Sequence, residues 1–334
     1  MIKIIGRIIL FFALIQLTPS CSEYNKIVKD DDYDKKLLKA EELYNSGSYN
    51  RALVLYEQVY QRHPRDDKGE TSYYKLGMTY YNLEDYYMSA YYLSNFVGKF
   101  PRSKRVEDAM YYSALSSVRN SPSPSLDQED TEKAINDLQY FISRYPNSRR
   151  VDTCNQMMDD LRAKLEKKAL LSVELYDRMQ KYQAAVTAAE SFLEEYPQTE
   201  HRLRIVMLML ENQSVLAEKS VFSKRKERLE KIMEIYEKHR EELQMSKHFA
   251  KAVKISEDAG ESLEEVDEIV TFEEIQNLYK LSQQASKAKK IEYLEETLKL
   301  YYTFVQRYPR SSYLGRAEEI FNRAERERQN TYSY

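Results

Sequence analysis

Five stretches of this chain end in the same way: YEQVYQRHP (residues 56–64), LSNFVGKFP (93–101), LQYFISRYP (138–146), AESFLEEYP (189–197) and YYTFVQRYP (301–309). Each has an aromatic residue or histidine directly before a proline. Because proline cannot continue a helix interior and disfavours helical dihedrals at the preceding residue, each stretch predicts a helix end. A small polar residue follows each proline and predicts the N-cap of the next helix: Asp66, Ser103, Ser148, Thr199 and Ser311.

Upstream of the stops, a large side chain is followed three residues later by a small one, as in Tyr49 with Ala52. This pattern resembles the tetratricopeptide repeat. The family's Leu-Gly, Tyr and terminal Pro positions fall on Leu76, Gly77, Tyr80 and Pro101. Paired helices cross closely only where small residues lie at the contact, and the candidates are Gly77, Ala114, Ala52 and Ala134. The chain has only 7 Gly and 8 Pro, which disfavours the many turns of a sheet-rich fold. The sequence therefore predicts an all-α fold, an α-solenoid of about five to six tetratricopeptide-like helix pairs.

The spacing between the five prolines is irregular, at 37, 45, 51 and 112 residues. The third unit gains an exposed loop over residues 121–130 (SPSPSLDQED), and the fourth, which has no helix breaker, gains a longer helix. Residues 202–243 read as a degenerate fifth pair whose second helix spans residues 227–243. An acidic linker is expected near residues 257–271, followed by a last pair and a capping helix over residues 313–328.

The first twenty residues have the pattern of a secretory signal. Lys3 and Arg7 precede an apolar run that is too short to span a bilayer, and small or turn residues then lead to Cys21. Residues 17–21 (LTPSC) resemble a bacterial lipobox, so Cys21 is the expected lipidation site; the alternative is an ordinary signal with a leftover thiol. The expected division is residues 1–20 as signal peptide, 21–33 as lipidated tether, 34–200 as N-terminal repeats and 201–334 as C-terminal helical repeats with a cap.

The repeats, the signal and the phrase aromatic-Pro-x-Ser together resemble the BamD family, the lipoproteins of the bacterial outer-membrane β-barrel assembly machinery. The phrase stands at residues 100–103, 145–148 and 308–311, and residues 211–214 (ENQS) look like the Bacteroidetes-type versions. The resemblance implies a protein on the periplasmic face of the outer membrane. It also implies that the C-terminal half contacts a POTRA domain of the barrel protein BamA and that the N-terminal half engages unfolded outer-membrane barrel proteins.

Two surfaces are candidates for these contacts. Tetratricopeptide offsets turn one set of side chains toward a substrate groove: Leu37, Tyr44, Asn45, Tyr74, Met78, Tyr81, Asn82, Tyr111 and Arg119. Tyrosines bury a large area at low entropic cost and offer a hydroxyl, which suits an extended peptide. The alternative is that many of these tyrosines only pack between helices. A basic cluster that includes Lys224, Arg225 and Arg228 is the candidate for partner docking, against the alternative of a solvated helix start.

Signatures of catalysis are missing from the sequence. The four histidines form no metal-ligand spacing, and no phosphate-binding glycine loop or G-x-S-x-G elbow occurs, so we expect no enzyme, metal or cofactor. Loss of Lys3 and Arg7 with the signal takes the formal charge from -3 to -5, which argues against nucleic acid as a partner. Two other non-enzymatic functions remain open: a pilotin-type periplasmic scaffold, and a nutrient-binding lipoprotein of the SusD type, although the absence of Trp disfavours the latter.

Overall fold

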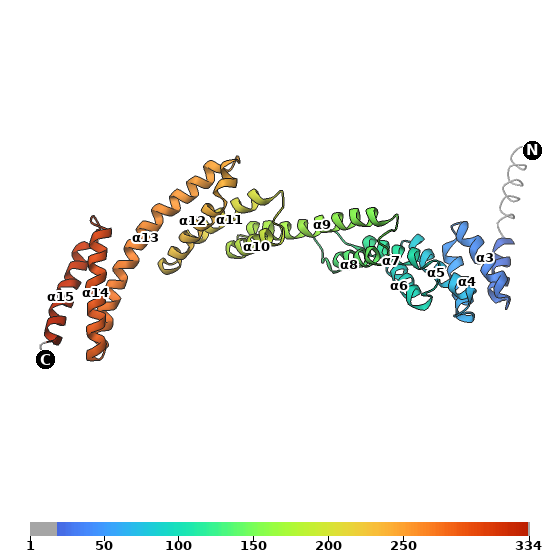
Figure 1. Ribbon diagram of the computed structural model, residues 1–334, viewed down its shortest axis with the longest axis horizontal. Helices are drawn as coiled ribbons and strands as arrows, with labels where there is room; N and C mark the ends of the chain where they lie inside the picture. Colours follow the sequence, from blue (N-terminus) through green and yellow to red (C-terminus); the bar gives the residue numbers. More distant parts are fainter. Residues whose placement is uncertain (1–18, 333–334) are drawn as a thin grey trace, which may run out of the picture. The chain divides into compact units, whose positions relative to one another are not determined.

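The computed structural model describes residues 19–332, except for the side chains of residues 19–22, 223 and 332. Within this range the chain forms fourteen α-helices and no strand, which confirms the predicted all-α fold (Figure 1). The chain divides into two compact units, of which unit 1 ends at Lys168 and unit 2 begins at Ala169. This division by packing falls inside a helix and not at residue 200, where the functional division is expected.

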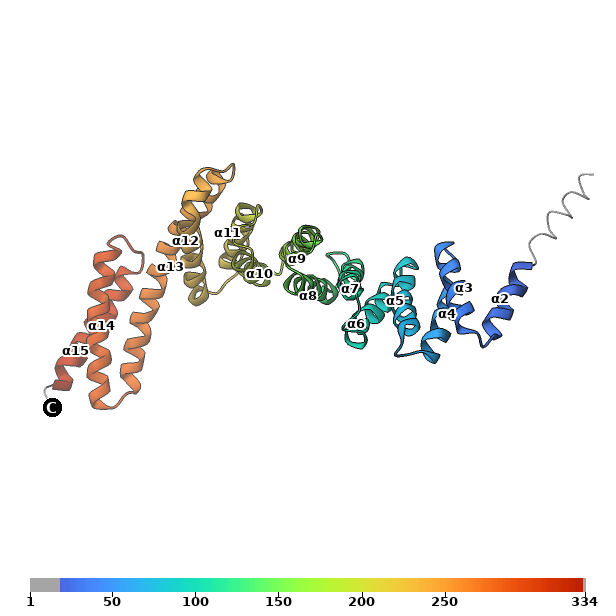
Figure 2. The same ribbon diagram turned by 45° about the vertical axis from the view of Figure 1, so that its right-hand side comes forward.

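Unit 1 consists of consecutive helices that pack against their neighbours in the sequence (Figure 2). Its helices are α2 (Pro19–Lys29), α3 (Tyr33–Asn45), α4 (Tyr49–Arg62), α5 (Asp67–Asn82), α6 (Tyr86–Lys99), α7 (Val106–Asn120), α8 (Glu129–Arg144) and the first part of α9 (Val151–Arg178). Besides its sequence neighbours, α5 contacts α3 and α7. The first helices of three successive pairs therefore form one continuous row.

All five predicted helix ends are present. In each, the aromatic or histidine residue before proline leaves the helix while its backbone N–H still donates to the carbonyl four residues earlier, as Phe100 does to Phe96 at 2.8 Å. The ψ angles of these five residues lie between 58° and 66°, outside the helical region. The proline that follows is the physical cause.

Small residues lie at the helix contacts as predicted, with Ala52 and Ala134 fully buried. The approach is closest at Gly77, where an added Cβ atom would lie 2.5 Å from Cγ of Leu93. Leu93 itself is fully buried. The pair formed by α5 and α6 therefore depends on the missing side chain of this glycine.

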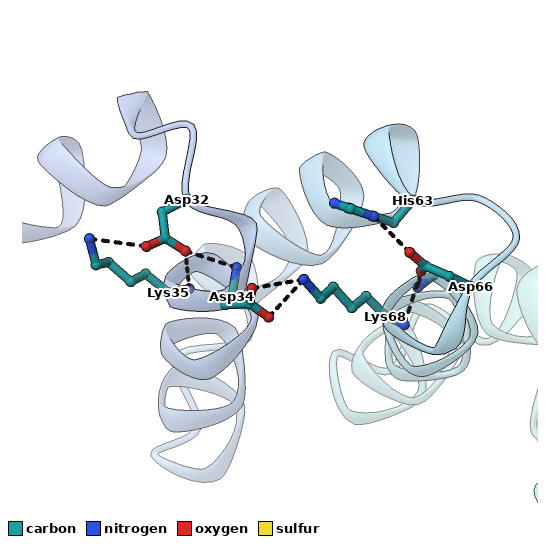
Figure 3. A network of polar contacts seen from close by, with 7 residues as sticks. Asp32, Asp34, Lys35, His63, Asp66 and Lys68 are labelled. Atoms are coloured by element: carbon teal, nitrogen blue, oxygen red, sulfur yellow. Dashed lines mark hydrogen bonds and ion pairs between the residues drawn. The ribbon is translucent and has the colours of Figure 1, made fainter.

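Polar contacts connect successive helix pairs at the junctions between them. Figure 3 shows the contacts at the first junction. Asp66 caps α5 as predicted, accepting hydrogen bonds from the backbone of Lys68 and Gly69. Lys68 in turn pairs with Asp34 on α3 at 2.8 Å. The prediction for the other four N-caps is wrong: the side chains of Ser103, Ser148, Thr199 and Ser311 accept from the backbone N–H two residues later, in a turn that precedes the helix.

The segment expected to form the lipidated tether, residues 21–33, is largely helical. Residues 19–29 are helical in α2, where Tyr24 and Ile27 pack against the core formed by α3 and α4. The Lys36 ammonium, whose residue is only 4% exposed, donates to the backbone carbonyl of Val28 at 3.0 Å. The apolar residues of α2 thus attach this segment to the first repeat, and its role as a lipidated tether stays a prediction. The side chain of Cys21 lies outside the described residues.

Unit 2 contains the end of α9 and six further helices: α10 (Tyr182–Glu195), α11 (Arg202–Glu218), α12 (Phe222–Gln244), α13 (Phe249–Gln284), α14 (Lys287–Arg307) and α15 (Leu314–Tyr332). The degenerate fifth pair, the capping helix and the lengthened helix of the fourth unit are present as predicted, and α9 has 28 residues. The expected acidic linker is wrong. Residues 257–271 belong to α13, which continues for 36 residues, since glutamate is a good helix former and buried Ala259 and Val266 hold the segment in the core.

Candidate functional site

Aromatic side chains from α3, α5 and α7 meet along one row of helices in unit 1. The hydroxyl oxygen of Tyr44 on α3 accepts a hydrogen bond from the Asn82 amide of α5 at 2.8 Å. The Lys75 ammonium lies 4.0 Å from the centre of the Tyr44 ring. Both contacts join two successive repeats through one tyrosine.

The row continues from α5 to α7. The ring of Tyr81 meets that of Tyr112 edge-on, with 5.2 Å between their centres. Tyr112 also contacts Tyr111, which packs against Phe141 of α8. We call the surface formed by Tyr44, Tyr74, Tyr81, Tyr111 and Tyr112 the tyrosine face.

Arginines from the junctions border this face. The Arg150 guanidinium lies 4.4 Å from the centre of the Tyr111 ring and pairs with Asp108 at 2.6 Å. Arg105 lies 5.8 Å from the centre of the Tyr74 ring and pairs with Glu70 at 3.0 Å. Such cation–π contacts fix the planar guanidinium groups over the rings, so the positive charges keep defined positions.

The phenol groups of Tyr44, Tyr74 and Tyr111 stay neutral near pH 7. Burial, with a smaller contribution from the charge of Asp108, raises the pKa of Tyr74 to about 12. Burial also raises the pKa of Tyr44 and of Tyr111. Neutral phenols both donate and accept hydrogen bonds, so the face offers peptide groups either partner.

The structure brings together five of the nine predicted groove residues: Tyr44, Tyr74, Tyr81, Asn82 and Tyr111. Leu37 and Met78 are partly buried against hydrophobic cores of unit 1, as are Tyr44, Tyr74 and Tyr111. Asn45 and Arg119 are exposed. Sequence reasoning missed Tyr112, Lys75 and the two junction arginines; the repeat of basic residues after each proline was the available signal.

In the predicted docking cluster of unit 2, one residue is exposed and the others are partly buried. Lys224 is exposed and lines a cleft of about 610 Å³ between α10 and α12. Arg228 lines the same cleft, but its guanidinium donates to the carbonyl of Leu216 at 3.0 Å and to the hydroxyl of Ser220. Arg228 therefore closes the C-terminal end of α11 and is no free docking charge. The Nε atom of Arg225 is buried without a hydrogen-bond partner.

Lys226, the next residue of the basic cluster, is bound within the fold. Its ammonium pairs with Asp267 of α13, whose carboxylate also pairs with Arg307 at 2.7 Å. Burial alone would raise the pKa of Asp267, but hydrogen bonds from Lys226 and Tyr308 outweigh it and the pKa is lowered. This part of the cluster joins α12 to α13 and α14.

Residues 19–332 contain neither a candidate metal site nor a candidate membrane span. No group of three or more His, Cys, Asp or Glu side chains in this range could hold a metal ion. None of the helices described has the length and apolarity needed to cross a membrane.

Comparison with protein families decides the identification. A family model described as "YfiO: Outer membrane lipoprotein" matches residues 30–229, which is more than half of the chain. The chain belongs to the YfiO family of outer membrane lipoproteins. The match includes the whole tyrosine face and the basic cluster around Arg225.

Similar proteins of the YfiO family carry the name "Outer membrane protein assembly factor BamD". That of Vibrio cholerae is 22% identical over 207 residues, covering 59% of this chain and 86% of its own length. That of Caulobacter vibrioides is 21% identical over 165 residues, covering 49% and 54%. Among solved structures, the TPR2AB domain of yeast Sti1 in its pHSP90 complex is similar over 88% of this chain and 98% of that one, at 14% identity and a TM-score of 0.34.

Proposed function

We propose that this protein is a scaffold of the β-barrel assembly machinery, anchored to the periplasmic face of the outer membrane by a lipid on Cys21. In this role the tyrosine face of unit 1 holds extended segments of unfolded outer-membrane barrel proteins. The observation that carries the proposal is the continuous contact of Tyr44, Tyr81 and Tyr112 with neighbours across three successive repeats. The relatives named as outer membrane protein assembly factors support it.

The chemistry of the face suits an unfolded chain. Tyrosine rings pack against apolar and aromatic side chains of any sequence, and their hydroxyls hydrogen-bond to backbone amides and carbonyls. Lys75 adds a positive charge directly over Tyr44. Such a surface binds many different segments weakly, which a carrier of varied substrates needs.

The test is site-specific photo-crosslinking in cells. A photoreactive residue placed at Tyr81 is expected to capture unfolded barrel proteins. The matched control is Tyr140 on α8, which is 64% exposed and not part of the face. If the position of Tyr140 captured these substrates while that of Tyr81 did not, the tyrosine face would be the wrong surface.

We propose a separate role for unit 2, which is to bind the barrel protein of the machinery. We expect residues 201–334 to dock a POTRA domain of a BamA-like barrel protein, with Lys224 and Arg225 near the contact. Lys224 is the exposed member of the pair, so its reversal to Glu should weaken co-purification of the barrel protein and increase its sensitivity to salt. Co-purification of a pilus secretin or a TonB-type transporter in its place would favour the pilotin-type or SusD-type alternative.

The lipid anchor has a separate test. A single acyl chain attaches a protein only marginally, so a stable anchor needs several chains. The Cys21→Ala variant is expected to leave the membrane fraction after a high-salt wash. If it stayed fully membrane-bound, the anchor would lie elsewhere.

A further inference from the structure

A basic cleft lies at the third junction of unit 1, where α7 begins and the turn from α8 to α9 closes against it. Its volume is about 770 Å³, within the range of sites that bind ligands or side chains. The charged residues that line it are four cations, Lys104, Arg144, Arg149 and Arg150, and two acids, Glu107 and Asp108. Tyr145 and Pro146 complete the wall.

Both acids of this cleft are already engaged within the fold. Asp108 pairs with Arg150 at 2.6 Å. Glu107 accepts a hydrogen bond from the hydroxyl of Ser148 at 2.7 Å. No hydrogen bond or ion pair is present for Lys104, Arg144 or Arg149 among the described residues, so three positive charges face the cleft without a protein partner.

The first junction shows that this imbalance is not a property of every turn. There the acids are numerous: Asp32 pairs with Lys35, Asp34 with Lys68 and Asp66 with His63 (Figure 3). In the turn at the third junction, residues 144–150 (RYPNSRR) contain three arginines and no acid. The excess charge therefore distinguishes the third junction from the first, in a chain whose formal net charge is -3; the turn at the second junction, residues 99–105 (KFPRSKR), is also basic.

The cleft and the tyrosine face are joined by one residue. Arg150 lines the cleft, and the same guanidinium covers the ring of Tyr111 at 4.4 Å. On the other side, Asp108 lines the cleft and acts electrostatically on the hydroxyl of Tyr74. A ligand that occupies the cleft can thus continue directly onto the aromatic surface.

We propose that this basic cleft binds the carboxylates of an acidic, extended peptide segment whose neighbouring residues lie on the tyrosine face. The inference rests on the proposed peptide-holding function of that face and adds a charge preference to it. A carboxylate accepts two parallel hydrogen bonds from one guanidinium, so Arg144 and Arg149 match this group in geometry as well as in charge. A concave site that opens onto a row of rings fits a peptide better than a flat anionic membrane.

The experiment uses the full chain purified from membranes and two fluorescent peptides with the same aromatic residues. One peptide carries Asp and Glu, and the other carries Asn and Gln at those positions. Wild type is expected to bind the acidic peptide more tightly, with a preference that decreases as salt is raised. The double variant Arg144→Glu/Arg149→Glu should bind the acidic peptide about tenfold more weakly, equivalent to ~1.4 kcal/mol, while its affinity for the neutral peptide stays unchanged.

The matched control is Arg62→Glu. Arg62 has the same position relative to its proline as Arg144 and also ends a helix, but it belongs to the balanced first junction. This variant should keep the preference for the acidic peptide, and circular dichroism should give the same helicity for all three proteins.

Four outcomes would overturn the inference. Unchanged affinity of the double variant for the acidic peptide would exclude the cleft. Equal weakening for both peptides would mean that the arginines only maintain the fold. Loss of binding to anionic phospholipid vesicles, with peptide binding intact, would assign the cleft to the membrane. If wild type bound neither peptide, the tyrosine face itself would fail as a peptide site, which separates the two proposals.

Discussion

The hydroxyl of Tyr308 on α14 donates a hydrogen bond to the carboxylate of Asp267 on α13 at 2.7 Å. Tyr308 is also the residue before the last of the five prolines, so a helix-ending residue of the repeat has a second role in tertiary structure. Asp267 is only 5% exposed and takes further contacts from Lys226 and Arg307. One buried carboxylate therefore holds three helices of unit 2 together.

Replacement of Asp267 by Ala should lower the free energy of unfolding of unit 2 by about 1–3 kcal/mol. The change removes charge-assisted hydrogen bonds and leaves the Tyr308 hydroxyl without its partner. Urea unfolding followed by circular dichroism measures the loss. Glu264→Ala on the exposed side of α13 is the control and should change stability little; an equal loss in both variants would mean that Asp267 has no special role.

The same carboxylate predicts a dependence on pH. Because the pKa of Asp267 is lower in the folded protein, its contribution to stability is complete above its ordinary pKa of 3.8 and is lost as the pH falls through the folded value. Wild type and Asp267→Ala should therefore converge in stability below about pH 3.8. A constant difference down to acidic pH would contradict the assignment.

Alanine substitutions at Gly77 and at Gly98 should have opposite effects on stability. An added Cβ atom would lie 2.5 Å from Cγ of Leu93, so Gly77→Ala should destabilise unit 1 by about 1–3 kcal/mol through overpacking. Gly98 in α6 has no atom within 4 Å of such a Cβ. Gly98→Ala should therefore be neutral or stabilising by up to ~1 kcal/mol, because alanine favours the helix. Thermal unfolding of the two variants measures the contrast.

These results also show which features local sequence can predict. The helix ends at Phe100 and Tyr308 were predictable because a proline acts on the residue directly before it. The row of Tyr44, Tyr74, Tyr81 and Tyr111 was predictable because helical periodicity fixes which side chains share a side.

Other features depend on partners that are distant in the sequence. The degree of burial of the groove residues was not predictable: Leu37 and Met78, like Tyr44, are partly buried against hydrophobic cores, because the angle at which neighbouring helices meet decides how much of each side chain stays exposed. Arg228 was assigned to docking because its charge was visible while the open carbonyl of Leu216 was not. The basic cleft was missed because Lys104 and the three arginines of residues 144–150 come together only when the turn from α8 to α9 packs against the start of α7.

Buried His239 of α12 should give the stability of the protein a second dependence on pH. It is 3% exposed, and its Nδ1 atom has no hydrogen-bond partner. Burial and then the charge of Arg202 lower the pKa of His239, and nearby Glu242 acts in the opposite direction. A lowered folded pKa means that its neutral form stabilises the fold above the ordinary value of about 6.5, and that this stability is lost as the pH falls through the folded pKa.

Wild type should therefore lose stability from about pH 6.5 downward, before the carboxylates titrate. His239→Gln should remove the pH dependence in this window, because glutamine keeps a similar volume and cannot be protonated. His248, which is partly exposed at the start of α13, is the control position for the same substitution. An unchanged pH profile in the His239 variant would assign the effect to other groups.

The last prediction separates structure from docking in the basic cluster. Arg228 donates to the Leu216 carbonyl and the Ser220 hydroxyl at the end of α11, whereas Lys224 is exposed one turn earlier on α12. Arg228→Ala should lower the free energy of unfolding by about 1–3 kcal/mol, because buried acceptors lose a charged donor. Lys224→Ala should stay within about 0.5 kcal/mol of wild type, as expected for a surface site.

Binding of the partner should depend more on Lys224 than on Arg228, the reverse of their effects on stability. If unit 2 docks a barrel protein through this cluster, Lys224→Glu reduces co-purification at unchanged helicity, and the reduction is largest at low salt, where charge contacts are strongest. Arg228→Ala should reduce co-purification only in proportion to the fraction of protein that has unfolded. Full co-purification with Lys224→Glu would place the contact elsewhere in unit 2, and α14 with α15 would be the next surface to test, because Tyr302 of α14 is 60% exposed.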